Sequence, residues 1–134
     1  MNGLDTNVIV RALISDDAEQ SSAAQRLFCS LTPANPGFVS LIALVETMWV
    51  LRQSYHYSRE SVSEIVIQLL NTADLQLEQE DLVRRAVDVA RETNRELPDV
   101  LISLSGARAG CDTTLTFDRK ATAIPGMSLL ATEI

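Results

Sequence analysis

Four carboxylic acids that are far apart in the sequence each lie inside or beside an apolar segment: Asp5, Glu46, Asp99 and Asp118. Apolar surroundings favour burial, and a buried unpaired charge is strongly disfavoured, so such side chains normally meet a cation, a base or a metal. If the fold brings the four together, the natural ligand is a hard divalent cation, because Mg²⁺ and Mn²⁺ prefer carboxylate and water oxygens. The sequence therefore predicts a Mg²⁺ or Mn²⁺ site built from these acids.

Glu46 has the most unusual surroundings of the four. On a helix its neighbours three and four residues away are all apolar: Ile42, Ala43, Trp49 and Val50. A solvent-facing glutamate normally has polar neighbours on its helix, so this pattern predicts a buried acid with a functional role. The alternative is an exposed face, with Trp49 also at the surface, as at an oligomer interface.

The other three acids have simpler structural explanations. Asp5 could cap the helix that follows it, and Asp99 could be stabilised by the dipole at a helix N-terminus. Asp118, which precedes Arg119, could be a cap or half of a surface ion pair. Asp112 is the one other acid in this region that could take the place of Asp118 in the site. We interpret it as a turn residue, because it precedes the strand expected at residues 113–117 instead of following it.

Short apolar runs alternate with longer amphipathic ones, which is typical of an α/β domain with a parallel sheet. No internal repeat or linker interrupts the pattern. The strands are expected at residues 3–5, 38–39, 74–77, 113–117 and 127–130. The helices are expected at residues 7–13, 18–31, 41–53, 59–70, 79–93 and 98–109, with Ser40 and Ser58 as N-caps.

This assignment places three of the acids at comparable positions. Asp5 and Asp118 fall just past the carboxyl ends of two strands, and Asp99 falls at a helix N-terminus. In open parallel sheets, ligands bind outside the carboxyl edge of the strands. We therefore expect these acids at the functional edge of the sheet.

Length and hydrophobicity indicate one domain with a packed core. The chain has 134 residues, of which 46% are hydrophobic. Glu46 interrupts the longest apolar run, so no run reaches the roughly 18 residues that a membrane span needs. The first residues lack the basic start and the apolar stretch of a secretory signal. We expect a cytoplasmic protein with no membrane segment.

The charge balance argues against passive binding of nucleic acid by a broad basic face. The net charge is −7, from 18 acidic and 11 basic side chains. Bound metals could still supply local positive charge, and an acidic surface favours a basic protein partner. Four basic residues are weak candidates for phosphate contacts: Arg11, Arg95, Arg119 and Lys120.

Cysteine and histidine offer no competing chemistry. Cys29 and Cys111 are the only cysteines and form no metal-type pair, and a cytosolic chain rarely keeps a disulfide. His56 is the only histidine, and a single histidine cannot build a His-rich zinc site. The candidate chemistry thus rests on the carboxylates.

The acids and their neighbours resemble a known family. The resemblance is carried by LDTN at residues 4–7, the apolar helix with Glu46, PDVLI at residues 98–102 and LTFDR at residues 115–119. In this order they resemble a PIN-domain ribonuclease, above all the VapC-type toxin of type II toxin–antitoxin systems. Asn2, Pro98 and Ala121 depart from the family pattern, and none of these departures removes a carboxylate.

The resemblance implies a three-layer α/β/α sandwich with a central, mainly parallel sheet, formed by residues 1–134 as a single PIN-like domain. Asp5, Glu46, Asp99 and Asp118 would match the family's metal-binding acids. Thr6, Asn7 and Thr116 would match its polar supporting positions. The implied partners are an RNA substrate, a cognate antitoxin protein and a second copy of the chain in a homodimer.

The implied activity is metal-dependent endoribonuclease cleavage. Asp5, Asp99 and Asp118 would hold one or two Mg²⁺ or Mn²⁺ ions, with Glu46 near the attacking water. Two alternatives remain open from the residues themselves. Asp5 could be the nucleophile of an aspartyl-phosphate enzyme, although Asn7 stands where such chemistry commonly wants a second Asp. The acids could also form a non-catalytic pocket that only holds a metal or a basic peptide.

Overall fold

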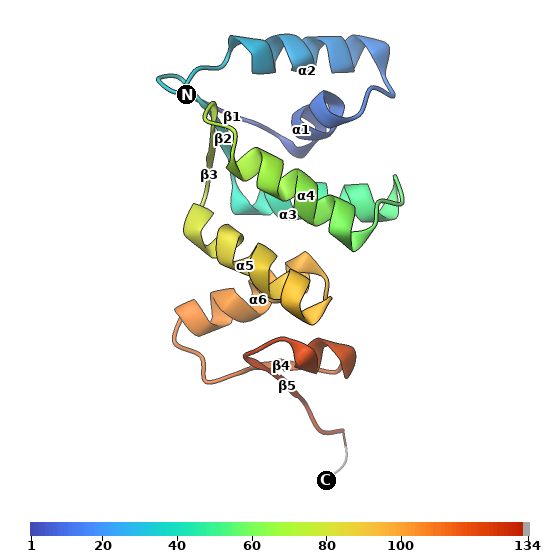
Figure 1. The fold of residues 1–134 in the computed structure, drawn as a ribbon, viewed down its shortest axis with the longest axis vertical. Helices are drawn as coiled ribbons and strands as arrows, with labels where there is room; N and C mark the ends of the chain where they lie inside the picture. The colour runs from blue at the N-terminus through green and yellow to red at the C-terminus, as the bar shows by residue number, and fades with distance from the viewer. Residues whose placement is uncertain (133–134) are drawn as a thin grey trace. The chain divides into compact units, whose positions relative to one another are not determined.

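The structure is a computed structural model that describes residues 1–132. The chain forms two compact units (Figure 1), Met1–Glu80 and a second that begins at Asp81. Each unit contains helices and a small parallel sheet, and each carries two of the four acids.

The sheet of the first unit has the strand order β1-β2-β3, and all its strands are parallel. The strands are β1 (Asn2–Gly3), β2 (Gly37–Val39) and β3 (Leu75–Leu77). Phe38 pairs with Gly3 on one side and with Gln76 on the other. The ladder extends past β1, since the Leu4 amide donates to the Phe38 carbonyl at 2.9 Å. Asp5 therefore follows the last residue that this sheet holds.

Four helices belong to the first unit: α1 (Thr6–Leu13), α2 (Ala18–Ser30), α3 (Leu41–Gln53) and α4 (Arg59–Leu70). Two begin at serine caps that the sequence predicts. The Ser40 hydroxyl accepts from the Ala43 amide at 3.1 Å, and the Ser58 hydroxyl accepts from the Ser61 amide at 3.0 Å. The side chains that form the core include Ile9, Val39, Leu44, Met48, Leu51 and Val66.

The second unit contains α5 (Glu80–Thr93), whose first residue is the last of the first unit. It also contains α6 (Leu97–Arg108), β4 (Thr114–Thr116) and β5 (Met127–Leu129). A 3₁₀ helix, η1 (Lys120–Ala123), lies between the two strands in sequence. β4 and β5 pair in parallel and α6 packs on β4. The core includes Val83, Ala86, Val100 and Ile124.

The connection from α5 to α6 is tight and places Asp99. Asn94 adopts a left-handed conformation with φ 55°, and the Arg95 amide still donates to the Ala90 carbonyl at 3.2 Å. Asparagine tolerates this conformation better than most residues. Pro98 then occupies the first turn of α6, where its missing N–H costs nothing.

The predicted α/β class with parallel strands is confirmed, and the element bounds agree within a few residues. Two details differ. The sequence did not predict η1, and β1 is shifted to Asn2–Gly3. Among residues 1–132 the strands form two separate ladders, one in each unit. None of the helices in this part of the chain has the length and apolar character needed to span a bilayer.

Candidate active site

Asp5 occupies the N-cap position of α1, but its carboxylate makes no capping hydrogen bond. Its backbone carbonyl accepts from the Val8 and Ile9 amides at 3.0 and 3.2 Å. The side chain is exposed. Helix capping therefore does not explain this acid, and its oxygens remain accessible for another ligand.

Glu46 lies beside the residue that follows Asp5. The Thr6 hydroxyl, which is buried, donates to Oε2 of Glu46 at 3.2 Å. This bond connects the start of α1 to the middle of α3, 40 positions later in the chain. In the first unit, β1 and α3 thus bring Asp5 and Glu46 into one neighbourhood.

The expectation that Glu46 is buried is wrong. Its side chain is exposed, on a face of α3 with Ile42 and Trp49, which are 73% and 41% exposed. The buried residues of α3 are Ala43, Leu44, Thr47, Met48 and Leu51. Because α3 is apolar on several sides, the spacing of its residues could not indicate which side faces the core. Asp5 and Asp118 are likewise exposed.

Asp99 lies in the first turn of α6 and is half-buried. Burial raises the pKa of its carboxyl above the ordinary value, and the negative charges of Glu96 and Asp118 raise it further. An acid that is simply stabilised by a helix dipole would show a pKa lowered from that value. Asp99 is instead held where burial disfavours its charged form, with two further acids nearby.

Asp118 follows β4 and is fixed by two hydrogen bonds. Its amide donates to the Thr116 hydroxyl at 3.0 Å, and its Oδ1 accepts from the Lys120 amide at 2.9 Å. The second bond closes a turn of the chain across Arg119, the N-cap residue of η1, so Asp118 has a local structural role. Oδ2 lies outside both of these bonds. Asp118 and Asp99 form the acidic pair of the second unit.

Two of the three predicted supporting residues contact an acid within their own unit. Thr6 donates to Glu46, and Thr116 accepts from the Asp118 amide. Asn7 is exposed and lines a groove. Within neither unit, as far as residue 132, do three His, Cys, Asp or Glu side chains lie close enough together to hold a metal ion. The structure therefore gives two pairs of acids, one in each unit.

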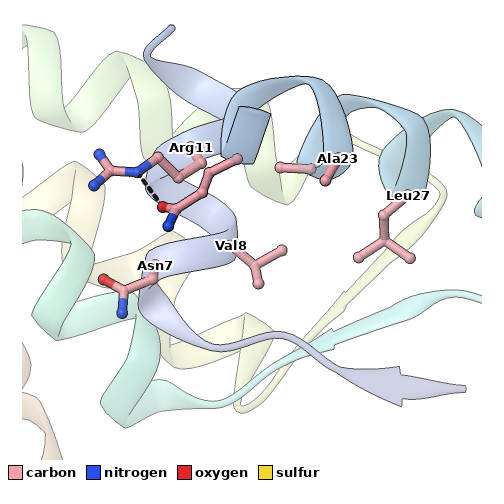
Figure 2. Close-up of a pocket in the computed structure, with 7 residues that line it drawn as sticks. Asn7, Val8, Arg11, Ala23 and Leu27 are labelled. Atoms are coloured by element: carbon pink, nitrogen blue, oxygen red, sulfur yellow. Dashed lines mark hydrogen bonds between the residues drawn. The ribbon is translucent and has the colours of Figure 1, made fainter. Parts of the chain in front are cut away.

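A groove of about 340 Å³ lies between α1 and α2 (Figure 2). Its lining combines apolar and polar side chains: Asn7, Val8, Arg11, Gln20, Ala23, Ala24 and Leu27. Arg11 Nε donates to the Gln20 side-chain oxygen at 2.9 Å. The groove begins next to Asn7, so it adjoins the segment that carries Asp5 and Thr6.

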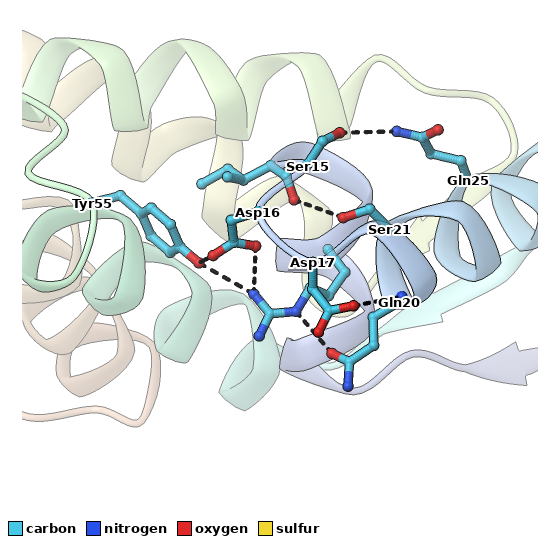
Figure 3. Close-up of polar contacts among 9 residues, drawn as sticks. Ser15, Asp16, Asp17, Gln20, Ser21, Gln25 and Tyr55 are labelled. Carbon is cyan, nitrogen blue, oxygen red and sulfur yellow. Dashed lines mark hydrogen bonds and ion pairs between the residues drawn. The ribbon is translucent and has the colours of Figure 1, made fainter.

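Arg11, a candidate for phosphate contact, is engaged in a polar network (Figure 3). Its Nη1 forms an ion pair with Asp16 at 2.8 Å and a hydrogen bond with the Tyr55 hydroxyl at 3.2 Å. The Tyr55 hydroxyl also donates to Asp16, and this bond, together with the Arg11 charge, lowers the pKa of Asp16. The network connects α1 and the α1–α2 loop to Tyr55, which lies just after α3. Arg11 therefore has a structural role that the sequence did not reveal.

We expect Asp99→Asn to stabilise the metal-free protein at neutral pH. A native pKa above the unfolded value means that ionised Asp99 opposes folding, and this penalty grows as pH rises from about 4, the unfolded pKa, through the native pKa. Thermal melts of both proteins with a chelator, at a series of pH values, should show a higher Tm for the variant at pH 7. The difference should disappear at pH 3. A constant difference at every pH would contradict this origin.

The comparison with protein families identifies the chain. The sequence model of the PIN domain matches residues 4–126. The chain belongs to the PIN domain family. A relative of this PIN domain is the "VapC ribonuclease" of Aquifex aeolicus (strain VF5), which is 25% identical over 121 residues. The alignment covers 90% of this chain and 89% of the relative.

Among solved structures, this PIN domain matches VapC20 of Mycobacterium tuberculosis, described as a toxin that cleaves the sarcin-ricin loop. The sequence identity is 23%, and the match covers 94% of this chain and 96% of the other. The TM-score is 0.45.

Proposed function

We propose that this PIN domain is a metal-dependent endoribonuclease that acts as the toxin of a toxin–antitoxin pair. The observation that carries the proposal is the match to the PIN family over residues 4–126, which includes all four acids. The similarity to a VapC ribonuclease over 90% of the chain supports the choice of RNA as substrate. We further propose that residues 1–134 act as one domain, since the family match runs through both units.

The proposed metal ligands are Asp5, Glu46, Asp99 and Asp118. Their chemistry fits Mg²⁺ or Mn²⁺, because all four offer the hard carboxylate oxygens that these ions prefer. The charge distribution supports the same choice. Burial, and to a smaller extent the charges of Glu96 and Asp118, raise the pKa of Asp99, and a nearby cation would favour its ionised form.

In the proposed mechanism each acid has a role. Asp5, Asp99 and Asp118 would hold Mg²⁺ or Mn²⁺, and the ion would supply a lowered pKa of water and compensation for the charge on the phosphate. Glu46, oriented by the Thr6 hydroxyl, accepts the proton of the attacking water. Thr116 and the Lys120 amide keep Asp118 in place.

Removing divalent metal should abolish RNA cleavage, because Glu46 alone would lack the cation that the proposed mechanism needs to lower the pKa of the water and to compensate the charge on the phosphate. Purified protein is incubated with single-stranded RNA, with or without EDTA, and cleavage is measured on a gel. We expect activity with Mg²⁺ or Mn²⁺, none with EDTA, and recovery when either metal is added in excess.

The same assay separates the alternatives. Cleavage that is indifferent to EDTA would contradict the metal mechanism. A wild-type protein without nuclease activity in any divalent metal, but with a bound partner, would favour the non-catalytic module. A covalent phosphoenzyme trapped at Asp5 would favour the aspartyl-phosphate reaction.

For partners we propose an antitoxin and a second copy of the chain. The net charge of −7 favours a basic antitoxin. Ile42 and Trp49, exposed on one face of α3, are suited to a homodimer contact. Growth arrest on expression, relieved by Asp5→Ala and by co-expression of an adjacent small protein, tests the toxin role. Light scattering of the purified chain tests the dimer.

A further inference from the structure

The loop that joins α1 to α2 is held by a hydrogen bond at each of its residues (Figure 3). The buried Ser21 hydroxyl donates to the Ile14 carbonyl at 3.0 Å. Oδ1 of Asp17 accepts from the Gln20 amide at 2.9 Å and so caps α2. The bonds of Ser15 and Asp16 are formed with Gln25, Arg11 and Tyr55. The loop is therefore a well-fixed connection between the two helices.

Tyr55 connects this loop to the end of α3. It lies just after that helix, and its hydroxyl donates to Asp16. The same hydroxyl accepts from Nη1 of Arg11 at 3.2 Å, and that nitrogen also forms the ion pair with Asp16. We call Arg11, Asp16 and Tyr55 the Tyr55 network. It joins α1, the loop and the segment after α3, all within the first unit.

A second bridge joins α1 to α3 at the start of α1. There the Thr6 hydroxyl donates to Glu46 at 3.2 Å, which is longer than the usual range of about 2.5–3.0 Å between two oxygen atoms. At about 3.6 Å the two groups would no longer be hydrogen-bonded. A shift of a few tenths of an ångström between the two helices is therefore enough to release Glu46.

Polar bonds near both ends of α1 determine how it lies against α3. Thr6 is the first residue of α1, and Arg11 lies in its last turn. Ile9 and Val10 bury the helix in the core, but apolar contact is non-directional. α1 has only 8 residues, and helices this short depend on tertiary contacts. Without the Tyr55 network, the long Thr6 bond would have to hold this orientation against thermal motion.

We propose that Tyr55 is a positioning residue for Glu46. Its hydroxyl holds the loop and Arg11 against the end of α3, and this keeps α1 where Thr6 can donate to Glu46. The inference rests on the proposed ribonuclease function, in which Glu46 accepts the proton of the attacking water. Tyr55 acts only through α1 and Thr6 and takes no part in the reaction itself.

The kinetic test uses Tyr55→Phe, which removes the hydroxyl and keeps the ring. Cleavage of single-stranded RNA is measured over a range of RNA concentrations with saturating Mg²⁺. We expect kcat to fall about 5-fold, the loss typical of one hydrogen bond, with KM unchanged because Glu46 acts in the chemical step. In the Thr6→Val background, Tyr55→Phe should lower kcat no further, because the bond through which Tyr55 acts is already missing.

Two controls separate positioning from simple stabilisation. Tyr57→Phe is the matched control, since the Tyr57 hydroxyl forms no hydrogen bond within residues 1–132, and it should keep the wild-type kcat. Val66→Ala opens a cavity in the core of the first unit and should lower Tm while leaving kcat unchanged well below Tm. Asp16→Ala breaks the Tyr55 network from the loop side and should lower kcat to a similar extent as Tyr55→Phe.

Crystal structures of the wild type and Tyr55→Phe give a second readout that needs no activity. In the variant, the distance from Thr6 Oγ1 to Glu46 Oε2 should exceed about 3.6 Å. An intact bond in the variant, an unchanged kcat, or losses in Tyr55→Phe and Thr6→Val that multiply would each overturn the proposal. If wild-type protein cleaves no RNA with Mg²⁺ or Mn²⁺, the ribonuclease function fails instead, and the two structures still decide whether Tyr55 positions Glu46.

Discussion

Replacing Asp99 with asparagine should reduce the rate of Mg²⁺-dependent RNA cleavage by at least about 1,000-fold, because metal coordination contributes several kcal/mol to such reactions. Asparagine keeps the size of the side chain and removes its charge. Asp99 is half-buried and its pKa is raised, chiefly by burial, so a nearby cation would favour its ionised form. Initial cleavage rates at saturating metal provide the measurement.

The control is Asp88→Asn, which changes an exposed acid of α5 in the same unit. This variant should keep the wild-type rate. Circular dichroism of both variants should match the wild type. Full activity of Asp99→Asn would remove this residue from the mechanism, whereas equal losses in both variants would point to overall charge.

Replacing Glu46 with glutamine should lower the cleavage rate by about 100-fold, the range typical for loss of a general base. Thr6→Val should cost less, since it removes only the hydrogen bond that orients Glu46. The double variant should lose no more than Glu46→Gln alone, because the two residues act as a unit. The measurement is kcat for each variant with saturating RNA and metal.

Glu64→Gln serves as the matched control, since Glu64 is an exposed acid of α4 in the same unit. We expect no change in kcat for this variant. If Thr6→Val and Glu46→Gln instead gave independent, multiplying losses, Thr6 would have a role apart from orienting Glu46.

Features set by local chemistry were predictable from the sequence. Ser40 and Ser58 cap α3 and α4 as expected, because a hydroxyl just before a helix accepts from a free amide of its first turn. Pro98 likewise marks the start of α6 and fixes Asp99 in its first turn.

Features set by distant neighbours were not predictable. The exposed position of Glu46 depends on which side of α3 packs on the core, and an evenly apolar helix does not specify this. The Tyr55–Asp16 bond joins residues 39 positions apart. η1 is too short for a periodic signal, and it begins at a side-chain bond from Asp118.

The roles of the supporting residues came from resemblance alone, and the structure adds a physical reason for two of them. Thr6 holds a carboxylate oxygen, whereas Thr116 holds the backbone of the acid that follows it. No pattern in the sequence distinguishes these two threonines from the others. The pairing of Asp99 with Asp118 required the packing of α6 on β4.

The short connection between α5 and α6 has a consequence for how this chain tolerates insertions. Asn94, Arg95 and Glu96 alone turn the chain from the buried face of α5 to the first turn that carries Asp99. One added residue here would rotate and displace that carboxylate, while an insertion in the exposed Thr32–Asn35 turn changes no acid. Homologous chains should therefore vary in length at the second place and keep it fixed at the first.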